Sequence, residues 1–270
     1  MDNRPIGIFD SGVGGLTVFE AIQKRLPNES LIYLGDTARV PYGNRSANTI
    51  KKYARNATHL LDQEGIKALV IACNTASAHA YEDLRETYDF PVIGVIEPTA
   101  EDAVQTSRSG NIGVIGTRAT VNSGSYEKAI QGFRKDANIF QVACPLFVPL
   151  AEEGWKDHRV TGLIVDEYFN AFEQTDIDVL LLGCTHYPIL RDVIERSIHT
   201  HFPDLKVLDC SNATAEQLEK VLMNERILRE EIPPQYRFFA TDDPERFLKN
   251  ATAFLANNIQ IVEHVEITNV

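Results

Sequence analysis

The stretch Asp178-Val-Leu-Leu-Leu-Gly-Cys-Thr-His-Tyr-Pro188 has the pattern of a buried strand followed by a turn and the start of a helix. Its apolar run, Val179 to Leu182, is typical of a parallel strand that is covered on both faces. Gly183 allows the backbone to turn, so the segment Cys184-Thr-His186 is expected at the carboxyl end of the strand. Ligands bind at that edge in open α/β sheets. The stretch therefore predicts an α/β fold with a thiol at a ligand-binding edge.

A second segment, Ala68-Leu-Val-Ile-Ala-Cys-Asn-Thr75, repeats this arrangement and places Cys73 after an apolar strand. Ile6-Gly-Ile-Phe-Asp-Ser11 also resembles Ile112-Gly-Val-Ile-Gly-Thr117, at an offset of 106 residues. The two cysteines are 111 residues apart, which is nearly the same offset. Two such matches indicate duplicated α/β units. Duplicated units would place Cys73 and Cys184 on opposite walls of one cleft.

Predicted strands and helices alternate along the whole chain of 270 residues. Strands are expected at residues 6–9, 31–35, 68–72, 91–95, 111–115, 139–143, 179–182, 206–208, 237–240 and 260–265. Helices are expected between them, among them residues 46–64, 75–88, 120–133 and 244–255. The alternation predicts parallel sheets joined by right-handed crossovers.

The composition argues against nucleic acid and membranes as partners. The chain has 38 acidic and 26 basic residues, which gives a net charge of −12. No apolar run approaches the ~18 residues that span a bilayer, and the N-terminus lacks the apolar segment of a signal peptide. The four cysteines lack CxxC spacing and are expected to be reduced thiols of a cytoplasmic protein. Cys144 and Cys210 are assigned structural roles.

Three of the predicted strand ends carry polar residues that suit either structure or chemistry. The loop Asp10-Ser-Gly-Val-Gly-Gly15 could hold an anion on its backbone N–H groups, or its glycines could serve a tight turn. Both cysteines are expected to precede a helix, a position that lowers the pKa of a thiol. Asn74, Thr75 and Thr185 are residue types that cap helices or bind carboxylates.

His186 and Asp10 each suit more than one role. His186 follows Cys184 closely and is either structural or able to exchange a proton with the thiol. Asp10 could orient a thiol or bind an ammonium group. Cys184 and His186 supply only two ligands of an incomplete set, so no metal site is expected.

Taken as a set, four motifs resemble those of bacterial glutamate racemases, in the aspartate/glutamate racemase family: Asp10-Ser11, Tyr42-Gly43, Cys73-Asn74-Thr75 and Cys184-Thr185-His186. The resemblance spans the whole chain and includes Pro-Leu-Phe-Val-Pro-Leu-Ala-Glu-Glu-Gly at 145–154. It implies cofactor-independent interconversion of L- and D-glutamate, which supplies D-glutamate for peptidoglycan, by an enzyme that is often a homodimer. It also implies two α/β domains with the active site in the cleft between them, residues 1–97 with 210–270 and residues 98–209.

The resemblance further implies residue roles. Cys73 would take the α-proton from D-glutamate with help from Asp10, and Cys184 would take it from L-glutamate with help from His186. Asp36 and Glu152 match two more acidic positions implicated in catalysis in the family. The residues implied in substrate binding are Asp10, Ser11, Tyr42, Gly43, Asn74, Thr75, Thr185 and His186.

Some family members carry an N-terminal extension that is linked to activation by a peptidoglycan precursor. Asp10 lies so near the start here that neither the extension nor this activation is expected. Three other functions stay open. The chain could racemise another acidic amino acid, especially aspartate, by the same chemistry. It could be a dithiol oxidoreductase, against which the missing CxxC counts, or a non-catalytic two-lobed amino-acid-binding protein.

Overall fold

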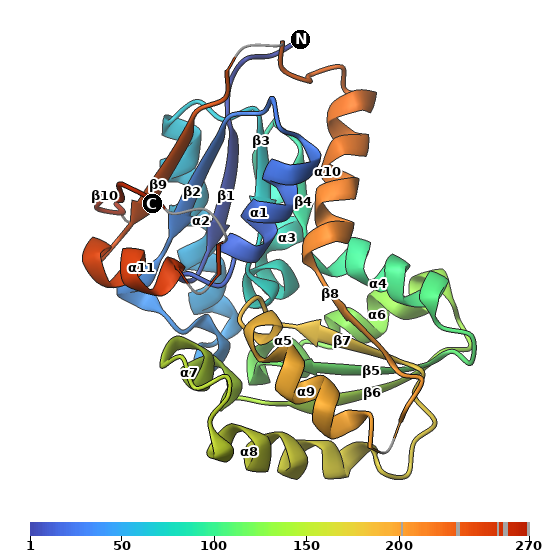
Figure 1. Cartoon of the computed structure of the whole chain (residues 1–270). Coiled ribbons are helices and arrows are strands. Elements are labelled where there is room, and N and C mark those ends of the chain that lie inside the picture. The colour runs from blue at the N-terminus through green and yellow to red at the C-terminus, as the bar shows by residue number, and fades with distance from the viewer. Residues whose placement is uncertain (201, 231–232, 253, 256–258, 269–270) are drawn as a thin grey trace.

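Two parallel β-sheets with helices packed on them make up the fold in the computed structural model, which describes residues 1–200, 202–230, 233–252, 254–255 and 259–268 (Figure 1). The six-stranded sheet has the order β10-β9-β2-β1-β3-β4 and the four-stranded sheet the order β6-β5-β7-β8. The strands are β1 (Ile6–Asp10), β2 (Leu31–Gly35), β3 (Ala68–Ile71), β4 (Val92–Gly94), β5 (Asn111–Gly116), β6 (Asn138–Ala143), β7 (Val179–Gly183), β8 (Lys206–Asp209), β9 (Tyr236–Ala240) and β10 (Glu263–His264).

Helices occupy the segments between most of these strands. They are α1 (Leu16–Arg25), α2 (Ala47–Gln63), α3 (Asn74–Thr87), α4 (Ile96–Thr106), α5 (Arg118–Asn122), α6 (Ser125–Phe133), α7 (Phe147–Glu152), α8 (Arg159–Phe169), α9 (Arg191–Ile198), α10 (Ser211–Asn224) and α11 (Pro244–Ala251). No helix within the described ranges has the length and apolar character that crossing a bilayer requires.

The two sheets share one topology. The order β2-β1-β3-β4 in the first sheet corresponds strand by strand to β6-β5-β7-β8 in the second, and the pairs are parallel. Cys73 follows β3 and Cys184 follows β7, so the two thiols occupy equivalent positions. The prediction of two similar parallel-sheet α/β units is confirmed. The division at residues 97/98 and 209/210 stays a prediction.

Strand β7 is buried on both faces, as its continuous apolar run predicts. All five of its residues are buried. Val179 and Leu181 pack in one hydrophobic cluster, whereas Leu180 and Leu182 pack in another on the opposite face of the sheet. A strand alternates its side chains between two faces, and both faces here are covered. Each fully buried leucine or valine stabilises the fold by about 1.5–3 kcal/mol.

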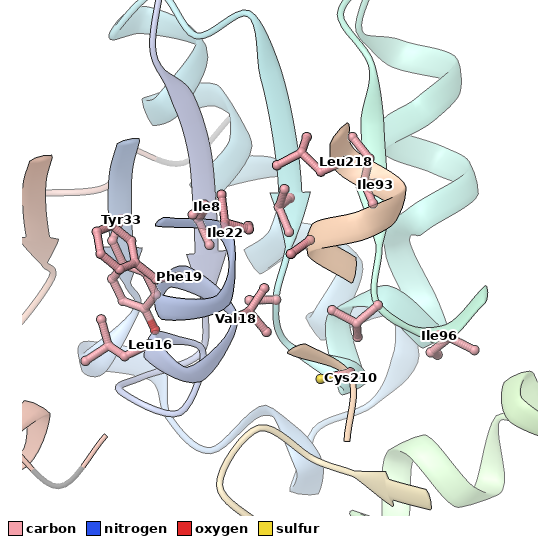
Figure 2. Close-up of a cluster of buried hydrophobic side chains, with 14 of the residues drawn as sticks. Ile8, Leu16, Val18, Phe19, Ile22, Tyr33, Ile93, Ile96, Cys210 and Leu218 are labelled. Carbon is pink, nitrogen blue, oxygen red and sulfur yellow. The ribbon is translucent and has the colours of Figure 1, made fainter. Parts of the chain in front are cut away.

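The first sheet is covered in the same way. Figure 2 shows the cluster between α1 and the six-stranded sheet, where Leu16, Phe19 and Ile22 of the helix lie near Ile8 and Tyr33. The rings of Phe19 and Tyr33 meet edge to face with centroids 6.2 Å apart. This packing fixes α1, and with it the loop between β1 and α1 that directly follows Asp10.

Three predicted segments differ from the structure. The helix expected at 120–133 is two helices, because Gly124 adopts φ +66 between α5 and α6. The helix expected at 244–255 ends at Ala251, and position 253 lies outside the described residues. The strand expected at 260–265 is shorter, since β10 comprises Glu263 and His264, and Val265 adds one main-chain hydrogen bond to Ala240 of β9.

A buried lysine ties the N-terminal segment and the segment after α10 to the first sheet. Lys67, the residue before β3, has a fully buried side chain and forms an ion pair with buried Glu29 at 2.7 Å. Its Nζ also donates hydrogen bonds to the main-chain oxygens of Asp2 at 2.8 Å and Ile227 at 2.7 Å. Removing one partner of a buried ion pair leaves the other charge uncompensated, which costs about 3–5 kcal/mol.

We therefore expect Lys67→Met to lower the free energy of unfolding by about 3–5 kcal/mol. Lys24→Met is the matched control, because Lys24 pairs with Glu20 at 2.9 Å with its own side chain largely exposed. The control should change the free energy by no more than about 0.5 kcal/mol. Urea unfolding of both variants measures the difference, and equal losses would contradict the assignment of Lys67 as a buried anchor.

Candidate active site

A small cavity brings together the carboxyl ends of strands from both sheets. Its volume is about 20 Å³, which is room for about one water molecule. Larger depressions of about 300, 530 and 590 Å³ contain none of the predicted site residues. The small cavity is lined by Ser11, Val40, Pro41, Tyr42, Gly43, Cys73, Asn74, Thr75, Thr117, Val148, Cys184, Thr185 and His186. Chemistry rather than size therefore selects it as the candidate site.

Both predicted thiols are on the wall of this cavity, together with every predicted substrate-binding residue except Asp10. Cys73 is 5% exposed and Cys184 is 6% exposed. The four cysteines are all free thiols. The structure thus gathers residues that are separated by more than 100 positions in the sequence, and their individual roles stay predictions.

Cys73 is itself the N-cap of α3. Its Sγ accepts a hydrogen bond from the N–H of Ala76 at 3.5 Å and lies 3.8 Å from the Oγ of Ser11. The helix acts to lower the pKa of this thiol, as expected, through the N–H of Ala76, but the net shift is upward. Burial and the negative charge of Asp10 raise the pKa of Cys73 to about 12, which outweighs the Ala76 and Ser11 contacts. Cys73 is therefore a thiol at neutral pH.

Because Cys73 caps the helix, Asn74 and Thr75 do not need to. The Oγ1 of Thr75 lies 2.9 Å from that of Thr117 and 3.1 Å from that of Thr120, so it joins α3 to the end of β5. The amide of Asn74 also bonds outside its own helix, to Tyr126 and to Cys210. These polar side chains hold the two units together across the cavity.

The segment after Cys184 differs from the segment after Cys73. Residues Tyr187–Leu190 form a 3₁₀ turn, and α9 begins only at Arg191. The expectation that both cysteines directly precede an α-helix is therefore wrong for Cys184. Thr185 does not cap a helix either, since its hydroxyl donates to the Oδ1 of Asp10 at 3.2 Å.

Asp10 is fully buried behind the cavity wall. Its Oδ2 accepts a hydrogen bond from the N–H of Gly12 at 3.0 Å, so the glycine loop binds its own carboxylate. Burial raises the pKa of Asp10, while the positive charge of His186 and these hydrogen bonds oppose the rise. A Cβ at Gly14 would lie 2.5 Å from both His186 Nδ1 and Thr185 Oγ1. Glycine at that position is what allows the loop to approach the Cys184 segment.

His186 is buried between carboxylates. Its Nε2 lies 3.2 Å from Oε1 of Glu152, an ion pair that does not meet the geometry of a hydrogen bond. Burial alone would lower the pKa of His186, but its contacts with Cys184 and Glu152 outweigh this and raise the pKa from 6.5 to about 10. For Glu152 burial acts to raise the pKa, and His186 outweighs it so that the pKa falls. His186 is therefore an imidazolium at neutral pH, next to Cys184.

Asp36 is not on the cavity wall. It is fully buried, and its carboxylate accepts hydrogen bonds from the hydroxyl of Tyr42, from Thr241 Oγ1 at 3.0 Å and from Arg39 Nε at 3.0 Å. Tyr42 does line the cavity. The geometry thus connects Asp36 to the site through Tyr42 and not through direct contact.

Thr117 is a cavity residue that the sequence analysis did not propose. It follows β5 at the position that Ser11 occupies after β1, as the repeat of Ile6–Ser11 at Ile112–Thr117 indicates. Carrying the site residues of one repeat onto the other would have found it. Among the described residues, no group of three or more His, Cys, Asp or Glu side chains is arranged to hold a metal ion.

The protein is a duplicated α/β protein with two parallel sheets. One thiol from each sheet lines a single buried cavity. The chain matches the model of the Asp/Glu/Hydantoin racemase family over residues 11–218. It is 47% identical over 265 residues to a glutamate racemase of Persephonella marina, covering 98% of each chain. The chain belongs to the Asp/Glu/hydantoin racemase family.

Solved structures agree with this membership. A glutamate racemase of Bacillus anthracis superposes with a TM-score of 0.94 at 37% identity, covering 99% of each chain. A glutamate racemase of Francisella tularensis, solved in complex with D-glutamate, superposes with a TM-score of 0.92 at 38% identity, also covering 99% of each chain.

The pKa of His186 predicts how the stability of the protein depends on pH. Since the pKa is raised on folding, the charged form stabilises the folded state fully below about pH 6.5, and this contribution disappears as the pH rises to about 10. The stability difference between the wild type and His186→Asn should therefore shrink between pH 6.5 and pH 10. Urea unfolding at several pH values measures it. A difference that is the same at every pH would contradict the charged state of His186.

Proposed function

We propose that this chain interconverts L- and D-glutamate without a cofactor, using Cys73 and Cys184 as two bases. The observation that carries the proposal is that one thiol from each duplicated unit lines the same buried cavity. The glutamate racemases of similar sequence and structure support the choice of substrate.

The proposed reaction moves one proton off the α-carbon and another on. In the direction from L- to D-glutamate, the Cys184 thiolate takes the α-proton and becomes a thiol. The Cys73 thiol gives its proton to the opposite face of the carbanion and becomes a thiolate. The charged His186 stabilises a negative charge on Cys184, and the raised pKa of Cys73 suits a proton donor.

The reverse direction requires a proton to leave Cys73 first. Asp10 is the nearby carboxylate that we assign to this step. Burial raises the pKa of Asp10, which makes its carboxylate a stronger base. The two thiols interact with Asp10 and His186. The pKa values that a titration would give therefore describe these four groups together and not any single residue. Glu152 acts by keeping His186 charged, and Asp36 by holding Tyr42.

Substrate binding has to work in a buried, mostly uncharged cavity. No arginine is among the lining residues, so hydroxyl groups, the Asn74 amide and backbone N–H groups would bind the two carboxylates. We assign substrate binding to Asp10, Ser11, Tyr42, Gly43, Asn74, Thr75, Thr185 and His186. A cavity of about 20 Å³ is too small for an amino acid, so the two units would move apart for entry. Fixed donors in a dry site would then stabilise the carbanion.

The wider role follows the same proposal. The enzyme would act in the cytoplasm as a homodimer and supply D-glutamate for peptidoglycan synthesis. Its cleft would separate a domain of residues 1–97 and 210–270 from a domain of residues 98–209.

The substrate and the lack of a cofactor are tested together. Purified protein, dialysed against a chelator and free of pyridoxal phosphate, should remove the optical rotation of L-glutamate and of D-glutamate. Aspartate enantiomers should turn over far more slowly, because the same lining groups would have to span a substrate that is one methylene shorter. If aspartate turned over faster than glutamate, aspartate would be the substrate and the proposal would be wrong on this point. Tight glutamate binding without loss of rotation would favour a binding protein, and redox cycling of the thiols an oxidoreductase.

The two-base mechanism is tested in D₂O at low conversion. D-glutamate formed from L-glutamate should carry deuterium at Cα, because the delivering thiol has already exchanged with solvent. The remaining L-glutamate should carry little. Cys73→Ala and Cys184→Ala should each abolish racemisation and keep the fold, as judged by circular dichroism. Early product that retains its original proton would mean that one base serves both faces.

A further inference from the structure

One buried tyrosine contacts the segments of both thiols. Tyr126 is on α6 and is fully buried. Its hydroxyl donates a hydrogen bond of 2.6 Å to the Oδ1 of Asn74, the residue directly after Cys73. Its ring lies against Gly183, the residue directly before Cys184, where a Cβ would be 3.0 Å from the ring carbon Cε2. Tyr126 therefore connects two strand ends that belong to different sheets.

The hydroxyl of Tyr126 decides which way the Asn74 amide points. With Oδ1 bound to that hydroxyl, the Nδ2 group lies on the other side and is 3.7 Å from Sγ of Cys210. One Nδ2 hydrogen is directed to the sulfur, which leaves the second as a donor. Asn74 lines the cavity, where a donor attracts a substrate carboxylate and an amide oxygen would repel it. Burial raises the pKa of Tyr126 well above 10, so its hydroxyl keeps the proton that this arrangement needs.

We propose that Tyr126 is a positioning residue that fixes the Asn74 amide with an N–H group toward a carboxylate of the substrate. The inference rests on the proposed glutamate racemisation and adds a residue that does not touch the cavity. Cys210 takes part as the second contact of the amide, which gives this buried thiol a role beyond filling space.

The test is Tyr126→Phe, which keeps the ring against Gly183 and removes only the hydroxyl. Losing one hydrogen bond should raise KM for both glutamate enantiomers about three- to tenfold, with a smaller change in kcat. Tyr187→Phe is the matched control, because Tyr187 is also fully buried and its hydroxyl donates to the main-chain oxygen of Cys144 at 2.8 Å. The control should lose similar thermal stability and keep its KM.

A double-mutant cycle separates positioning from a general structural effect. If Tyr126 acts through Asn74, Tyr126→Phe should raise KM in the wild type and change it little in an Asn74→Ala background. An unchanged KM in the single variant, or an equal rise in both backgrounds, would overturn the role of Tyr126. Absence of glutamate turnover in the wild type would instead refute the proposed function, before any variant is compared.

Discussion

The burial of two thiols in one cavity of about 20 Å³ is the constraint on which the rest of the site depends. A buried thiol resists ionisation, as the pKa of about 12 for Cys73 illustrates. In the proposed mechanism, proton transfer involving such groups needs charged partners that are themselves buried. Asp10 and His186 are buried beside the thiols, and each is held by hydrogen bonds or by an opposite charge. The surrounding network follows from the need to keep these charges out of water.

Duplication supplied two equivalent thiols, and divergence made their surroundings different. In the register of the two sheets, Gly116 occupies in β5 the position that Asp10 occupies in β1. The carboxylate therefore exists only in the first unit. The second unit has His186 close to its thiol and Glu152 at the imidazole. One thiol thus meets a negative charge and the other a positive charge.

The sequence predicts those features of the fold that depend on a local pattern or on a repeated one. The apolar run at Val179–Leu182 predicted a strand buried on both faces, and the two offsets predicted the shared topology of the sheets. The break at Gly124 depends on one left-handed residue that leaves the surrounding helical pattern intact. The rise in the pKa of Cys73 comes from burial and from the charge of Asp10. Both effects depend on residues that are distant in the sequence and that the fold brings together. Local position before a helix was the weaker effect.

The contacts that close the cavity are of a kind that a substrate can replace. Thr75 and Thr117 are joined by neutral hydroxyl groups, and such a hydrogen bond contributes only about 0.5–1.5 kcal/mol net. Thr185 donates to the buried carboxylate of Asp10, and a hydrogen bond to a charged group contributes about 1.5–3 kcal/mol. A second carboxylate beside Thr75 and Thr117 would accept stronger, charge-assisted hydrogen bonds than the two hydroxyl groups give each other. In the ligand-free protein these contacts keep the hydroxyl donors hydrogen-bonded and away from water, in the places where the proposed substrate carboxylates would bind.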